Sequence, residues 1–159
     1  PAYVLSAIVG ASSGTIAKYL NSRQAISLSI LLIGVSVLAA GLFMGSYAWI
    51  FVISMIVFSS SFALMYAPMI DTAIRNIPAE KTGTAVGFYN LILNVAASIG
   101  IAYTAALMDN PALNKKIISF VDGSTHIIYS NTLFVLTIIA LVSFVLYMIF
   151  SRNMPKQVS

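Results

Sequence analysis

The side chains best able to contact a ligand lie in long stretches of sequence that carry no charge. Asn90 and Asn94 are four residues apart, so in a helix both carboxamides lie on one face, together with Gly87 and Ala97. Amide side chains donate and accept hydrogen bonds, either to a neighbouring helix or to a substrate. Both interpretations remain open at this point: interhelical packing, or a polar stripe along a substrate path.

A second uncharged stretch carries a stripe of Ser54, Ser61, Met65 and Pro68, with Tyr66 beside it. Pro68 removes one backbone donor and predicts a kink toward one end of its helix. Methionine and tyrosine would form an adaptable wall that suits varied apolar ligands. Ordinary packing between helices is the alternative. The predicted substrate cavity consists of Asn90, Asn94, Tyr66, Met65 and Ser61.

Asp71 is the acidic residue closest to an apolar stretch, and Arg75 follows it by four residues. This spacing predicts an ion pair along a helix, with a proton-carrying role for Asp71 as the alternative. The single histidine, His126, is expected to be solvated in a loop. The sequence has no Ser/His/Asp set, phosphate-binding loop or metal-ligating cluster, so we expect no catalytic residues, no metal site and no enzyme.

The composition determines which kind of element must position these residues. Of the 159 residues, 60% are hydrophobic and 8% are charged, against about 25% charged in soluble domains. The mean hydropathy is +0.98. Eight Lys and Arg residues are too few for a phosphate-binding face, which excludes nucleic acid as a partner. The chain is therefore expected to be an integral membrane protein whose partner is the lipid bilayer.

Membrane-spanning helices account for the uncharged stretches, because a span needs about 20 apolar residues and backbone polar groups find no water in lipid. A turn at Gly41, Gly45, Ser46 and Tyr47 divides the longest stretch. The alternative to a span in every case is that one of the five segments is re-entrant or buried. The sequence thus predicts an all-α fold with five transmembrane helices at 2–19, 25–44, 48–72, 82–108 and 129–151.

Basic residues predict the orientation of these spans, since cytoplasmic loops are enriched in Lys and Arg. The tail 152–159 falls on the basic side, and the loop 109–128 on the other. We therefore expect a multi-pass protein of the cell membrane with its C-terminus in the cytoplasm. The basic residues on the predicted cytoplasmic side are Lys18, Arg23, Arg75, Lys81, Arg152 and Lys156.

Small residues predict where helices approach closely. Gly10 and Gly14 form one such pair, and Ala96 and Gly100 another. The helices at 2–19, 48–72 and 82–108 are rich in Gly, Ser, Asn, Pro and Tyr, so we expect them to face a cavity. The aliphatic helices at 25–44 and 129–151 are expected to face lipid. Because the sequence begins Pro1-Ala2-Tyr3 inside an apolar stretch, we expect the C-terminal piece of a longer protein rather than a complete five-helix protein.

The segment from Gly14 to Arg23 resembles the second copy of the signature loop of the major facilitator superfamily, with Lys18 at the usual aspartate position. A second pattern is similar to the penultimate-helix region of the 14-helix drug/proton antiporters. It consists of Pro68, Pro78, Gly83, Asn90 and the segment 98–102. The segment 124–131 is similar to Gram-positive tetracycline-efflux pumps of that group.

This resemblance implies that the five helices correspond to helices 10 to 14 of such a transporter, and that the N-terminal half of the same transporter is the partner. It implies export of a small lipophilic substrate by alternating access, with the proton gradient as driving force and no cofactor. Those pumps carry acids where this sequence has Lys18 and Ala97, so proton coupling is expected in the other half and tetracycline is disfavoured as a substrate. The alternative function is a non-transporting membrane anchor or assembly subunit that uses its small-residue helix faces.

Overall fold

The computed structural model describes residues 4, 21–43, 48–117, 121 and 123–152. The predicted helix at 2–19, apart from Val4, lies outside these residues, and so do Gly10, Gly14 and Lys18. The tail beyond Arg152 also lies outside them.

Most of the described residues are helical, and no strand occurs among them. The four long helices are apolar enough and long enough to cross a membrane, which is compatible with a multi-pass membrane protein and confirms the predicted all-α class. Two short 3₁₀ helices, η1 and η2, lie in the connections before and after α4. The elements are α2 (Ser22–Leu42), α3 (Ala48–Ile74), η1 (Ala79–Lys81), α4 (Thr82–Met108), η2 (Pro111–Asn114) and α5 (Ser124–Arg152).

Two helices begin earlier than the sequence pattern predicted. The Gln24 side chain accepts a hydrogen bond from the Asn21 backbone N–H at 3.2 Å, so α2 starts at Ser22 and Arg23 lies in its first turn rather than in a loop. Gly123 has a φ of +92°, a conformation that glycine adopts readily. Because this turn places the helix start directly after it, exposed His126 belongs to α5 and not to the predicted loop 109–128.

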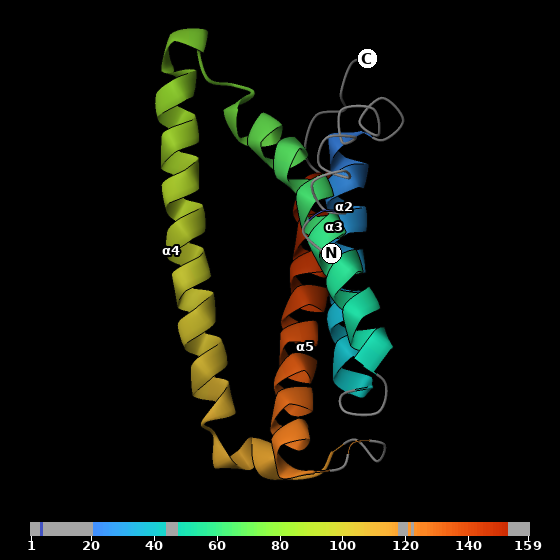
Figure 1. The fold of residues 1–159 in the computed structure, drawn as a ribbon. Coiled ribbons are helices and arrows are strands. Elements are labelled where there is room, and N and C mark those ends of the chain that lie inside the picture. Colours follow the sequence, from blue (N-terminus) through green and yellow to red (C-terminus); the bar gives the residue numbers. More distant parts are fainter. Residues whose placement is uncertain (1–3, 5–20, 44–47, 118–120, 122, 153–159) are drawn as a thin grey trace.

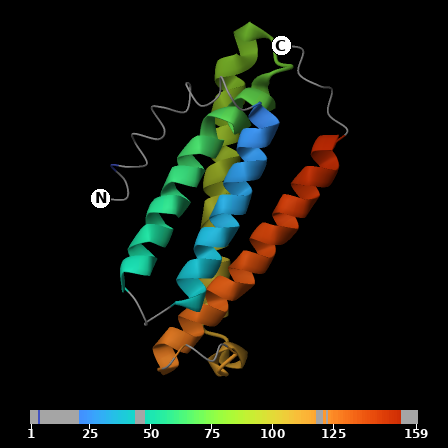
Figure 2. The ribbon, with the colours of Figure 1, turned by 90° about the vertical axis from the view of Figure 1, so that its right-hand side faces the viewer.

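The long helices form a cluster of three and a fourth that stands apart. In Figures 1 and 2, α2, α3 and α5 run side by side, whereas α4 is joined to this cluster mainly through the connections at its two ends. No residue of α4 is buried. α2 is the most enclosed of the described helices, whereas the sequence pattern predicted a lipid-facing position for 25–44. Its buried side chains are mostly small, which allows its neighbours to approach closely: Ala25, Ile26, Ser29, Gly34, Ser36, Ala40 and Gly41.

Gly41 brings α2 close to α5. A Cβ atom on Gly41 would stand 3.1 Å from the Leu133 Cβ and 3.4 Å from the Ser130 backbone oxygen, so a larger residue would require α5 to shift by a few tenths of an ångström. The Ser130 hydroxyl donates to the Gly41 carbonyl oxygen at 2.5 Å. Gly34, seven residues earlier, faces Ala140 at an ordinary contact distance of 3.6 Å.

The small-residue pair predicted at Ala96 and Gly100 does not form a helix contact among the described residues. Both residues are exposed, and no atom lies within 4 Å of a Cβ built on Gly100. The reason is that α4 stands away from the cluster, so close packing occurs at Gly34 and Gly41 of α2 instead.

A buried amide fixes the connection between α4 and α5. The Asn131 side chain, 2% exposed, donates to the carbonyl oxygens of Leu113 at 2.8 Å and Lys115 at 2.9 Å. These bonds hold the residues around η2 against the beginning of α5 and so position the end of α4.

Candidate binding groove between α3 and α4

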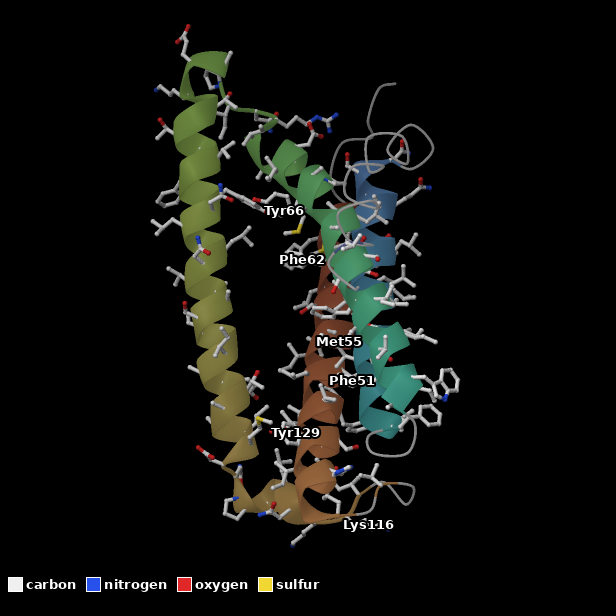
Figure 3. The ribbon with its side chains drawn as sticks, viewed as in Figure 1. Phe51, Met55, Phe62, Tyr66, Lys116 and Tyr129 are labelled. Carbon is white, nitrogen blue, oxygen red and sulfur yellow. The ribbon has the colours of Figure 1, made fainter. Side chains whose placement is uncertain are left out.

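One hydrogen bond between side chains connects α3 with α4. The Tyr66 hydroxyl donates to the Asn90 carboxamide oxygen at 3.0 Å. In Figure 3 the Tyr66 side chain extends from α3 toward α4. The structure therefore brings together two residues, 24 positions apart, that the sequence predicted for one cavity.

A groove of about 650 Å³ surrounds this hydrogen bond, a volume within the range of small-molecule sites. Both predicted carboxamides line it, together with the phenol and apolar side chains, and no charged residue does. The Asn90 amide nitrogen and the exposed Asn94 side chain leave hydrogen-bonding capacity for a ligand. The lining residues are Phe62, Tyr66, Asn90, Leu93, Asn94, Ala96 and Ala97.

Two of the predicted cavity residues lie elsewhere. Ser61 is buried, and its hydroxyl donates to the Val57 carbonyl oxygen of its own helix at 2.7 Å. Met65 is half-buried and does not line the groove. Phe62 lines the groove but was not predicted for it. It lies one helical turn before Tyr66 and on the same face, and this spacing could have indicated its position.

The stripe predicted on α3 is a packing face. Ser54, Ser61 and Pro68 are the buried residues of this helix, and they recur every seven residues. Ser54 borders an apolar cavity of about 250 Å³ that α2 and α5 also line. Pro68 lies inside α3, which continues to Ile74; its predicted kink stays a prediction. The side of α3 that carries Pro68 thus faces the other helices of the cluster. The Tyr66 side chain extends toward α4 instead.

The predicted ion pair between Asp71 and Arg75 is not formed. Both residues are described, and no ion pair joins them. Both side chains are exposed, and an exposed ion pair gains little free energy over solvation of its two charges. A turn closed by the Ile77 N–H and the Ile74 carbonyl, 2.9 Å apart, redirects the chain where α3 ends.

Within the described ranges, no three His, Cys, Asp or Glu side chains gather in a way that could hold a metal ion. The lining residues of the groove offer hydrogen bonds and apolar contacts.

No protein family, curated protein or solved structure matches this chain. The resemblance to the 14-helix antiporters therefore stays a prediction from sequence motifs. The function has to be inferred from the groove and from the helices that form it.

The Tyr66–Asn90 bond should be measurable as an energetic coupling between α3 and α4. In a double-mutant cycle of Tyr66→Phe and Asn90→Ala, we expect a coupling of about 0.6 kcal/mol in the free energy of unfolding, the average for interhelical hydrogen bonds in membranes. Unfolding of the purified chain in mixed micelles provides the measurement. Tyr103→Phe, at an exposed tyrosine of α4, serves as the control for the loss of a hydroxyl. A coupling of zero would show that the two side chains do not interact.

Proposed function

We propose that this chain is the C-terminal part of a major facilitator superfamily transporter, a proton-coupled exporter of lipophilic drugs or metabolites that works by alternating access. The single observation that best supports the proposal is the groove between α3 and α4, which the Tyr66–Asn90 hydrogen bond spans. Four helices long enough to cross a membrane provide the setting that such a transporter needs.

The lining of the groove favours a substrate class. Its walls are apolar except for two carboxamides and one phenol, and none of its lining residues is charged. An ionised substrate would lose its hydration without gaining a counter-charge, which is costly in a membrane interior. A lipophilic substrate with a few hydrogen-bonding groups loses little on entering and can bond to Asn90 and Asn94.

The position of α4 supports the proposal that this helix moves during transport. α4 has no buried residue and is attached to the cluster mainly at its ends, so its remaining faces are available to the N-terminal half of the transporter. Alternating access requires helices that separate and re-form contacts at small cost. We propose that the Tyr66–Asn90 bond is one contact that opens and closes as substrate enters.

A membrane anchor or assembly subunit is the second candidate. A Cβ atom placed on Gly83, Gly87 or Gly100 of α4 would meet no other atom within 4 Å, so a partner helix can approach this helix closely. This function requires a partner helix but no movement of substrate.

Transport in membrane vesicles distinguishes the two candidates. Inverted vesicles that contain the full-length transporter should accumulate a lipophilic fluorescent dye when a proton gradient is imposed, and a protonophore should abolish the accumulation. Vesicles without the protein provide the control. Equal dye uptake in both vesicle preparations would refute the exporter and leave the anchor.

A further inference from the structure

A second groove lies where α3 ends, η1 follows and α4 begins. Its volume is about 690 Å³. It shares no residue with the groove around Tyr66 and Asn90. Its lining residues are Ala73, Ile74, Ile77, Lys81, Thr84, Ala85, Phe88, Tyr89 and Ile92.

The polarity of this groove changes along its length. Lys81 and Thr84, both exposed, lie at the end where α4 begins. One and two turns further along α4, the lining consists of Ala85, Phe88, Tyr89 and Ile92. Helical spacing keeps these residues on the same side, and the Tyr89 hydroxyl is the polar group among them. A cationic and hydroxylated mouth followed by an apolar trough fits an amphiphile with an anionic head.

The length of the groove matches one leaflet of a bilayer. At a rise of about 1.5 Å per residue, Lys81 and Ile92 are about 16 Å apart along the axis of α4. The hydrocarbon layer is about 30 Å thick, so a chain lying in this groove would extend from the headgroup level to about the bilayer midplane. A free phosphate or a headgroup alone would leave the apolar trough unoccupied.

The positive charge of Lys81 at the mouth of the groove favours an anionic headgroup. The Lys81 side chain forms no ion pair within the part of the chain that the structure describes, and the neighbouring Glu80 does not line the groove. An ammonium group at the membrane surface attracts anionic lipids. The Thr84 hydroxyl, close to Lys81 in the sequence, can donate to a phosphate or ester oxygen.

We infer that this groove binds an anionic phospholipid, with one acyl chain along Phe88 and Ile92 and the phosphate at Lys81. The site holds a structural lipid whether or not the protein transports a substrate, so its test does not depend on the proposed export.

Native mass spectrometry of the full chain, released from micelles with equal amounts of phosphatidylglycerol and phosphatidylcholine, tests this inference. The unaltered chain should retain phosphatidylglycerol about fivefold more than phosphatidylcholine, the preference that one basic residue at a membrane surface confers. Lys81→Gln should abolish the preference. Lys115→Gln, at an exposed lysine beyond the opposite end of α4, should leave it unchanged.

A second variant tests the acyl-chain part of the site separately. Ala85→Phe keeps Lys81 but fills the trough, so retention of both lipids should fall while the circular dichroism spectrum and elution volume stay unchanged. Retention of phosphatidylglycerol equal to that of phosphatidylcholine by the unaltered chain would overturn the inference. Displacement of the bound lipid by millimolar glycerol 3-phosphate would also overturn it, because the headgroup alone would then suffice.

Discussion

Replacement of both Asn90 and Asn94 by alanine is expected to reduce export by the proposed full-length transporter about tenfold. Each carboxamide offers a substrate one hydrogen bond worth about 0.5–1.5 kcal/mol, and the loss of about 1.4 kcal/mol corresponds to a factor of ten. Membrane insertion should not suffer, because alanine is less costly to place in lipid than asparagine. The amount of inserted protein should therefore equal that of the unaltered transporter.

The export experiment compares initial rates of dye accumulation in inverted vesicles at matched protein content. Asn76→Ala with Asn114→Ala is the matched control, since both asparagines are exposed and neither lines the groove. The control should export at the normal rate. Export by the Asn90 and Asn94 double variant at that same rate would remove these residues from the substrate path and leave them with helix packing only.

Substitution of Gly41 by valine is expected to destabilise the protein by about 1–3 kcal/mol, the usual cost of overpacking. A Cβ at this position already lies 3.1 Å from the Leu133 Cβ, and the two further methyl groups of valine need space that α5 occupies. Separation of the helices would also weaken the bond from the Ser130 hydroxyl to the Gly41 carbonyl. The free energy of unfolding in mixed micelles gives the size of the effect.

Gly87→Val provides the matched control for this substitution. No atom lies within 4 Å of a Cβ at Gly87, so valine there should change the stability by less than about 0.5 kcal/mol. Equal destabilisation by Gly41→Val and Gly87→Val would mean that the cost arises from the helix backbone and not from the contact between α2 and α5.

The fold class follows from the sequence because long stretches without charge have few alternatives in lipid. The bounds of α4 agree with the prediction at 82–108, since Lys81 and Asp109 bracket the apolar stretch. The burial of α2 between its neighbours could not be predicted from the sequence. Its Ser29, Gly34 and Gly41 are scattered among aliphatic residues, and a local pattern does not reveal which other helix lies opposite them.

The candidate groove was predictable in its residue types but not in its geometry. Asn90 and Tyr66 were both assigned to a cavity, yet their hydrogen bond depends on how α4 returns beside α3. Ser61 was misplaced because a serine on a packing face has the same spacing as one on a cavity face. The ion pair of Asp71 with Arg75 was predicted from their spacing alone, which does not show that both side chains are exposed.

The bond from Ser130 to Gly41 joins residues 89 positions apart, and Asn131 reaches back to residues 16 and 18 positions earlier. Because chains are synthesised from the N-terminus, α2 leaves the ribosome long before either donor exists. α2 and α3 both precede α5 in the chain, so these two helices can pack against each other first. The bonds made by Ser130 and Asn131 complete the helix cluster and the α4–α5 connection only once α5 has been inserted.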